Sequence, residues 1–306
     1  MTIMNLPDRA TLLAPVLIRV LIRVLTRVSA PVLPRVSTTV SATVLVLLMS
    51  APSLAFVNLS SHRAVYDLKL KSSHKRSGVK DLTGRMVIEM TGSDCEGWSV
   101  NFRLVNDFQL SRGKRRLVDS RSTSWESADG SQMSFFEREF IDNRPYQVTR
   151  LKASLKNHKV KQKQPKKLVF DIPEGTIFPV AHQKRLIEKA REGIFRDKSI
   201  VYDGADHDNI YQAITFIGKQ RKGETQPKTL KGDGANALLG DKISWPVTVS
   251  YYSLKDKKQQ DTPSQQIDFL MYENGIAGDL TIDYGDFAMS GKLIHLDKLP
   301  QSKCQQ

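Results

Sequence analysis

The sequence predicts a mainly β protein, in which one large curved sheet of roughly 12 to 14 strands carries one or two short helices. Three observations lead to this fold class. Bulky apolar residues alternate with polar ones in many short segments. Glycine next to aspartate, asparagine or serine separates several of these segments. Only one segment after residue 56 places its apolar residues at helical spacing.

The first 55 residues are expected to be an export signal that is removed. An uncharged apolar run from Thr43 to Met49 precedes Ser53 and Ala55, which are small residues at the −3 and −1 positions of a cleavage site. We therefore predict cleavage between Ala55 and Phe56, leaving residues 56–306 as one domain. The residue after the cleavage site is not a cysteine, so we expect no lipid anchor and a soluble exported protein.

The long front of this signal contains the tandem repeat LIRV-LIRV-LTRV at residues 17–28. Arginine at every fourth position would form one basic stripe on a helix, as in a transit peptide or an interfacial anchor. The simpler interpretation is low-complexity sequence upstream of a later start codon, because Pro31 and Pro34 interrupt such a helix. The sequence leaves this choice open.

Strand signals continue along the rest of the chain. Alternating apolar residues are clearest around Met86–Met90, Val247–Tyr251 and Leu280–Tyr284. Hairpin turns are predicted at these pairs and at one basic cluster: Asp129-Gly130, Asn274-Gly275, Gly285-Asp286, Ser290-Gly291 and Arg112–Arg116. Such a succession of short strands is typical of a barrel, a sandwich or a strongly curved sheet.

One helix is expected over residues 179–193, where Leu186 and Ala190 fall at helical spacing and Gly193 would end the helix. Two polar stretches, Lys156–Lys167 and Lys219–Lys242, are interpreted as connectors, the second a long mobile loop. For the lysine-rich first stretch we favour a solvated surface, with contact to anionic lipid as the alternative.

Charge limits the class of partner. Lysine and arginine number 46 against 32 aspartates and glutamates, for a formal net charge of +14. This balance favours anionic surroundings such as lipid headgroups or envelope polysaccharide. We set nucleic acid aside, because an exported protein rarely meets it and the chain shows no zinc-ligand spacing, aromatic RNA-binding strand or helix-turn-helix pattern.

The chain has two cysteines, Cys95 and Cys304, and six histidines. Cys95 could be a nucleophile, a metal ligand, a free buried thiol or half of a bridge. The histidines fall in no nucleophile signature, and neither C-x-x-C nor H-x-x-x-H occurs. An even pair of cysteines in an exported chain favours a bridge. We therefore expect no catalytic residue, no metal site and no cofactor.

Three weaker signals have competing interpretations. The carboxylates of Asp203, Asp206 and Asp208 could converge on calcium, but their spacing differs from that of a calcium loop and fits a turn capped by its own side chains. His182 is expected in the first helical turn, either packed or as a ligand contact. Gly232-Asp233-Gly234 lacks the strand and helix that flank a phosphate loop.

Several motifs together carry a family resemblance. They are HRAVYDLKL, GRMVIEMTGSDCEGWSVNFR, TSWESADGSQMSFF, IPEGTIFPVAH, YDGADHDNIYQAITFIG and ENGIAGDLTIDYGDFAMSGKLIHLDKL. In their order and spacing, from about His62 to Cys304, the chain resembles the EipB family of cell-envelope integrity proteins. The arginine-repeat leader lies outside this resemblance.

The resemblance implies a periplasmic protein with a β-spiral fold similar to the LolA and LolB lipoprotein carriers, and a disulfide between Cys95 and Cys304. It also implies a role in envelope integrity together with a periplasmic tetratricopeptide-repeat protein, without catalytic residues. We therefore expect a non-enzymatic interaction protein. The alternative is a carrier that holds lipid or lipoprotein acyl chains on the concave face, which rests only on likeness of fold.

Overall fold

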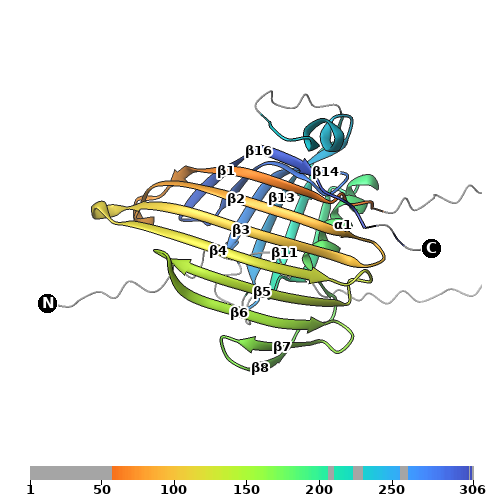
Figure 1. Cartoon of the computed structure of the whole chain (residues 1–306), viewed down its shortest axis with the longest axis horizontal. Helices are drawn as coiled ribbons and strands as arrows, with labels where there is room; N and C mark the ends of the chain where they lie inside the picture. The colour runs from red at the N-terminus through yellow and green to blue at the C-terminus, as the bar shows by residue number, and fades with distance from the viewer. Residues whose placement is uncertain (1–56, 206–209, 223–229, 256–260, 303, 305–306) are drawn as a thin grey trace, which may run out of the picture. The chain divides into compact units, whose positions relative to one another are not determined.

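The protein is described by a computed structural model covering residues 57–205, 210–222, 230–255, 261–302 and 304 (Figure 1). All of them belong to one compact unit. The predicted leader and its cleavage site, Ala55 and Phe56, lie outside the described residues, as do Asp206, His207 and Asp208. No helix among the described residues has the length and apolar character needed to cross a membrane.

A single sheet dominates this unit, and sixteen strands are found in the described part of the chain. The strands are β1 (His62–Ser73), β2 (Val79–Ser93), β3 (Gly97–Leu110), β4 (Arg115–Glu126), β5 (Gln132–Ile141), β6 (Arg144–Ser154), β7 (Lys159–Gln164), β8 (Leu168–Asp171), β9 (Thr176–Ile177), β10 (Arg196–Tyr202), β11 (Ile210–Ile217), β12 (Arg221–Lys222), β13 (Ile243–Ser253), β14 (Gln265–Tyr272), β15 (Ala277–Asp283) and β16 (Phe287–Lys298). The predicted mainly β fold is confirmed.

The order of the strands shows how the sheet is wound. From one end it runs β8-β7-β6-β5-β4-β3-β2-β1-β16-β15-β14-β13-β11-β10-β9, and β12 pairs with β13. All neighbours are antiparallel except β9 and β10. The two end strands, β8 and β9, are consecutive in the chain and are joined by residues 172–175. Since five residue steps span at most roughly 18 Å, the sheet must curl until its ends come close, although they do not pair.

The two ends of the sheet overlap. Tyr202 on β10 packs in one apolar cluster with Met133 and Phe135 on β5, and its ring lies 6.1 Å from that of Phe170 on β8. The next residue back, Val201, packs in a different cluster with Ile187 of the helix α1 (Pro179–Arg191). Because consecutive side chains on a strand point to opposite faces, β10 is covered on both sides. The sheet is therefore an open spiral.

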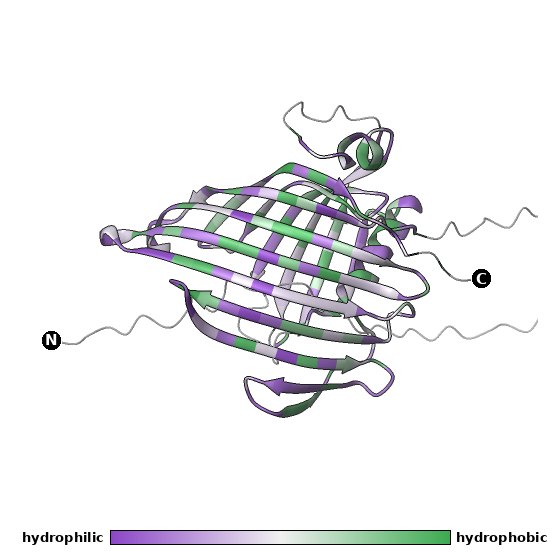
Figure 2. Ribbon diagram, in the orientation of Figure 1, coloured by the Kyte–Doolittle hydropathy of each residue, from purple (hydrophilic) through white to green (hydrophobic). Residues whose placement is uncertain are grey.

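Alternation produces the buried face of the longer strands. Ala64, Tyr66 and Leu68 on β1 are buried in a third apolar cluster. Figure 2 shows the same alternation as hydrophobic and hydrophilic bands along β2 to β6. The expected helix is also confirmed: α1 begins at Pro179, whose ring fits the first helical position, and Gly193 follows its C-terminus with φ of 73°.

Two expectations about connectors were wrong. The lysine-rich stretch 156–167 contains β7, whose Val160 and Gln162 point inward and are buried. The stretch 219–242 contains β12 and a π-helical turn, Ala235–Leu239, held because Leu238 and Leu239 are buried in the core. Together with the short β8 and β9, these segments explain why the sheet has more strands than predicted.

The turns at Asp129-Gly130, Asn274-Gly275 and Gly285-Asp286 connect consecutive strands as expected, with the glycines at φ of 65°, 87° and 79°. Ser290-Gly291 is not a turn but the middle of β16. A Cβ atom on Gly291 would come within 2.8 Å of Leu280 and 3.0 Å of Leu68, so this glycine allows close packing inside the sheet.

Candidate functional site

The two cysteines meet at one edge of the unit. Cys95 lies in the turn between β2 and β3, and Cys304 lies in the tail after β16. The structure joins them in a disulfide whose Cα atoms are 5.6 Å apart, which is an ordinary separation for such a bond. In this arrangement neither sulfur is a thiol, and the bond ties the C-terminal tail to the β2–β3 turn.

The same turn also contacts α1. Asp94, next to Cys95, accepts a hydrogen bond of 3.2 Å from the Trp98 indole nitrogen and forms an ion pair with Lys184. The Lys184 ammonium lies 5.8 Å from the centroid of the Trp98 ring. The disulfide therefore belongs to a structural junction of turn, tail and helix.

His182 is a packed residue. It is 1% exposed, and burial lowers its pKa to about 4, while Asp197 raises the pKa to a smaller extent. Asp197 is itself engaged by Arg185 at 2.9 Å and by the hydroxyl of Ser199 at 2.6 Å. A neutral imidazole buried in this way is a poor general base at neutral pH.

Glu126, at the end of β4, is a buried carboxylate that the sequence reasoning missed. It accepts hydrogen bonds from the backbone N–H groups of Val180 (2.8 Å) and Ala181 (3.3 Å) in the first turn of α1. Burial raises the pKa of Glu126 to about 7, although these two bonds oppose the rise. A carboxylate at a helix N-terminus stabilises the helix, so Glu126 attaches α1 to the sheet.

A second group of carboxylates lies where the sheet overlaps itself. Glu137 and Glu139 point to the buried face of β5, and both are 7% exposed. Burial, together with the smaller effect of the neighbouring charges of Glu139 and Asp203, raises the pKa of Glu137 to about 8. Asp203 accepts a bond of 3.1 Å from the N–H of Ala205, as expected for a turn capped by its own side chain. The other two aspartates of the proposed calcium loop lie outside the described residues.

The segment Gly232-Asp233-Gly234 packs against β16 and does not form a phosphate loop. The Asp233 carboxylate accepts a bond of 3.0 Å from the N–H of Lys298. A Cβ atom on Gly232 would lie 2.1 Å from the Leu296 carbonyl oxygen, so glycine is needed for this close approach.

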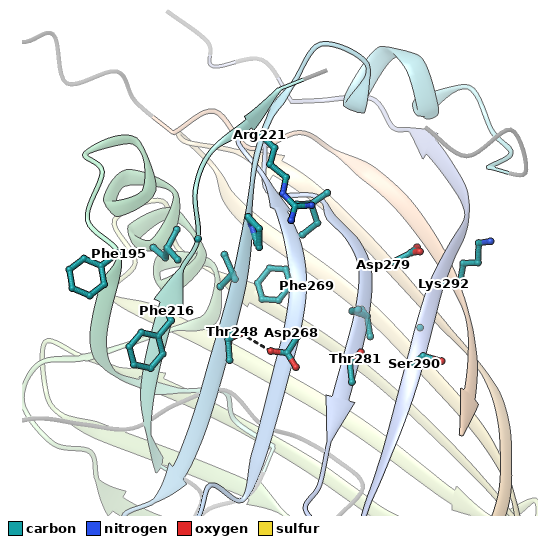
Figure 3. A pocket seen from close by; sticks show the side chains of 17 residues that line it. Phe195, Phe216, Arg221, Thr248, Asp268, Phe269, Asp279, Thr281, Ser290 and Lys292 are labelled. Atoms are coloured by element: carbon teal, nitrogen blue, oxygen red, sulfur yellow. Dashed lines mark hydrogen bonds between the residues drawn. The ribbon is translucent and has the colours of Figure 1, made fainter. Parts of the chain in front are cut away.

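An open groove of about 810 Å³ crosses β11, β13, β14, β15 and β16 (Figure 3). Its floor is a row of side chains that the strand register places opposite one another: Phe216, Thr248, Asp268, Thr281 and Ser290. These residues alternate with Val247 and Val249, which are buried in the core. The groove therefore opens on the face of the sheet that points away from the core.

One wall of the groove is aromatic and the floor is polar. Phe195, from the segment between α1 and β10, is 70% exposed, and Phe216 on β11 is 49% exposed. The Thr248 hydroxyl donates a bond of 2.6 Å to Asp268, and Lys71 donates one of 3.0 Å to the Thr281 hydroxyl. Figure 3 places Phe195 and Phe216 on one side and Asp279 and Lys292 on the other.

The chemistry of this groove is that of a binding surface. The described residues that line it include neither histidine nor cysteine, so its serine and threonine hydroxyls have no imidazole among these residues to activate them as nucleophiles. Exposed phenyl rings can bury apolar groups of a ligand, while Asp268 can accept hydrogen bonds from it. Sequence reasoning missed the groove because its residues come from strands far apart in the chain.

Comparison with known proteins agrees on one family. The sequence model described as EipB-like matches residues 53–300. The cell envelope integrity protein EipB of Brucella abortus (strain 2308) is 38% identical over 252 residues, which cover 81% of this chain and 87% of that protein. A crystal structure of a β-barrel-like protein of a domain of unknown function from Brucella abortus, 37% identical, superposes with a TM-score of 0.73 over 79% of this chain and 99% of the other.

Proposed function

Because this chain belongs to the EipB-like family, we propose that it supports the integrity of the cell envelope by binding a partner in the periplasm and not by turning over a substrate. One observation carries the proposal. The groove across β11 to β16 combines two exposed phenylalanines with a floor of bonded polar groups, an arrangement suited to recognition and not to acid–base or nucleophilic catalysis.

We propose a tetratricopeptide-repeat protein as the partner, on the basis of the family resemblance. Repeat proteins of this kind present extended concave surfaces to which other proteins bind. In the proposed complex, Phe195 and Phe216 are the anchors, because exposed aromatic side chains that become buried contribute much of the energy of an interface. The carboxylate of Asp268 lies on the floor of the groove and that of Asp279 on the side opposite the two phenylalanines, and both would add hydrogen bonds.

Substitution of Phe216 with aspartate tests this proposal. We expect Phe216→Asp to abolish capture of the repeat protein from cells and to fail to restore detergent resistance to a deletion strain, at normal abundance of the variant. Gln109→Asp is the matched control, since Gln109 is exposed on β3, outside the groove and outside the strands β4 to β8. If Phe216→Asp captures the partner and complements as well as Gln109→Asp does, the groove is not the binding site.

A carrier function is the second candidate, and the aromatic wall of the groove favours it too. The inner face of β10, β11 and β13 is occupied by α1 and core side chains, so an acyl chain would use the outward groove. Lipid that co-purifies with the wild-type protein but not with Phe216→Asp would support the carrier. Lipid-free protein that captures a partner would support the interaction.

Export is part of the proposed function. The N-terminal residue of the protein recovered from the periplasm should be Phe56, because Ser53 and Ala55 follow an uncharged apolar run. Intact-mass measurement of that protein tests this, and a mass that retains residues 1–55 would contradict it. Val57 and Leu59, which follow at once, are buried in the core, so a mature chain that begins here would enter the domain directly.

A further inference from the structure

Four neighbouring strands carry basic side chains on their outward face. We call this set, together with Phe136 in its midst, the basic face: Arg121 on β4, Arg138 on β5, Arg150 and Lys152 on β6, and Lys161 and Lys163 on β7. All six basic residues are exposed. Every exposed charged residue of β5, β6 and β7 is basic, whereas Glu137 and Glu139 point inward.

The register sets like charges beside one another. Arg121 lies directly opposite Arg138, and Lys152 lies opposite Lys161. Like charges in directly opposed positions of a sheet destabilise it. Burial does not account for these residue types, because their side chains are exposed. The repulsion between like charges is a cost to folding, and a use outside folding would explain why these residue types stand there.

Few acids neutralise this surface. Asp119 forms ion pairs with Arg121 and with Arg103, and Lys159, at the start of β7, pairs with Asp171. The other five basic residues of the basic face form no ion pair with any residue that the structure describes: Arg138, Arg150, Lys152, Lys161 and Lys163. Their charge is available to an external anion.

Aromatic contacts hold the two central guanidinium groups in place. The central carbons of Arg138 and Arg150 lie 5.2 Å and 4.7 Å from the centroid of the Phe136 ring. A guanidinium held against a ring keeps its N–H edge free for bidentate bonds to a phosphate oxygen pair. Two such groups around one ring form a preorganised anion-binding position.

The rim of the basic face is apolar. One register row runs from Trp125 through Ser134, Lys152 and Lys161 to Val169. Trp125 is 37% exposed and Val169 is the most exposed large aliphatic residue described. Basic residues flanked by tryptophan and aliphatic side chains are typical of surfaces that enter the headgroup region of a membrane.

We propose that the basic face docks on a bilayer surface rich in anionic phospholipid. Several phosphates would be bound across four strands, with Arg138 and Arg150 making the bidentate contacts. An acidic protein is less well matched, because the charges are spread over an open sheet face and not gathered in a pocket. The proposal is independent of the groove, which lies on other strands.

Vesicle sedimentation tests the proposal with the purified exported chain. We expect binding to vesicles of equal phosphatidylglycerol and phosphatidylcholine, little binding to pure phosphatidylcholine, and strong weakening at high salt. Arg138→Gln with Arg150→Gln should weaken binding at least tenfold, since each basic side chain near an anionic surface raises the affinity about fivefold. The lysine versions at both positions should recover part of the affinity.

The matched control removes two unpaired exposed charges elsewhere, Lys75→Gln with Arg112→Gln, at hairpin turns outside the basic face. It should bind within twofold of wild type. Equal weakening by both double variants would show that only net charge matters and would overturn the proposal. Absence of binding to anionic vesicles, or binding to polyglutamate in preference to vesicles, would also overturn it, the latter in favour of an acidic protein partner.

Discussion

The two ends of the sheet are built from the same kind of strand but differ in what covers them. At the β5–β7 end one face is buried and the other is exposed and basic. At the β9–β10 end both faces are covered, one by α1 and the other by β5 to β7. We therefore expect the enclosed end to contribute more to stability, whereas the residues on the exposed face of the outer end are less constrained by packing.

The contact between the two ends is not purely apolar. Met133, Phe135 and Tyr202 pack there, but the acidic Glu137, Glu139 and Asp203 are close enough for their charges to interact. Since burial raises the pKa of Glu137 and of Glu139, the overlap is expected to respond to pH. The exposed face of the same strand carries Arg138, the residue that follows Glu137, without this constraint.

Removal of the disulfide should produce the largest effect, because it releases the junction beside the enclosed end. Cys95→Ser opens a loop with a sequence separation of 209 residues. The chain-entropy argument gives a loss of about 5 kcal/mol as an upper value. We expect a lower unfolding midpoint in urea and lower abundance, with unchanged far-ultraviolet circular dichroism.

Thiol titration of the unfolded wild-type protein provides the accompanying check. Without reductant it should detect no free thiol, and with reductant it should detect both cysteines. Two thiols in the absence of reductant would show that the bond does not form and would make Cys95→Ser uninformative about a bridge.

Truncation of Phe178 tests the enclosed end itself. This residue precedes α1, is fully buried and packs against both β5 and β10. Phe178→Ala should lower the free energy of unfolding by about 3–5 kcal/mol, the usual cost for a buried phenylalanine. Phe195→Ala makes the same chemical change at a residue that is 70% exposed and should cost less than about 0.5 kcal/mol. Similar losses for the two variants would contradict the proposed difference.

Much of this arrangement could be read from local sequence, and the reasons are physical. Alternation in the β5 segment separates Glu137 from Arg138, and Pro179 with Gly193 marks the ends of α1, because these signals depend on near neighbours. The run Ile200-Val201-Tyr202 is a local sign of a strand buried on both faces, but it does not reveal which elements cover it.

Register and winding bring distant segments together, and these could not be predicted. Glu126 bonds Val180 of α1, which is 54 positions later in the sequence. The groove joins Phe216 to Ser290 across four strand pairs. β7 was missed because its outward residues are all lysines, so its two inward residues, Val160 and Gln162, gave too little apolar signal. The disulfide could be expected because the chain has two cysteines and because the family resemblance implies a bond between them.

The carboxylates at the overlap predict a pH dependence of stability. The folded pKa of Glu137 is about 8, above the ordinary 4.5, so the folded state holds a proton that the unfolded state releases. Stability should then fall as pH rises towards 8. Glu126, whose folded pKa is raised to about 7, adds to this loss of stability as the pH rises towards 7. His182, whose pKa is lowered, acts in the opposite sense but only below about 6.5.

Glu137→Gln isolates one group in the window from pH 6.5 to pH 8, where the histidine no longer contributes. The variant should lose about 2 kcal/mol less stability across this window than the wild type does, since one proton per molecule changes stability by about 1.4 kcal/mol per pH unit. Urea unfolding at several pH values measures it. Arg138→Gln, one residue away on the outward face, should leave the pH dependence unchanged; parallel curves for wild type and Glu137→Gln would refute the assignment.

The double substitution of Arg138 and Arg150 on the basic face should have the smallest effect on stability of the changes proposed for the two ends, although it should weaken lipid binding strongly. Arg138→Gln with Arg150→Gln removes two contacts with Phe136, each of which contributes roughly 0.5–1 kcal/mol at an exposed site. It also relieves the repulsion between Arg138 and Arg121, a term of about 0.2–1 kcal/mol for opposed like charges. These contributions have opposite signs, so the net loss should lie between about zero and 2 kcal/mol. Thermal unfolding of the double variant beside wild type measures this sum.

A loss of more than about 2 kcal/mol would mean that the guanidinium groups hold β5 and β6 together. The outer end would then resemble the enclosed end in being required for folding. A change near zero would leave external recognition as the reason for placing five unpaired bases on one open face.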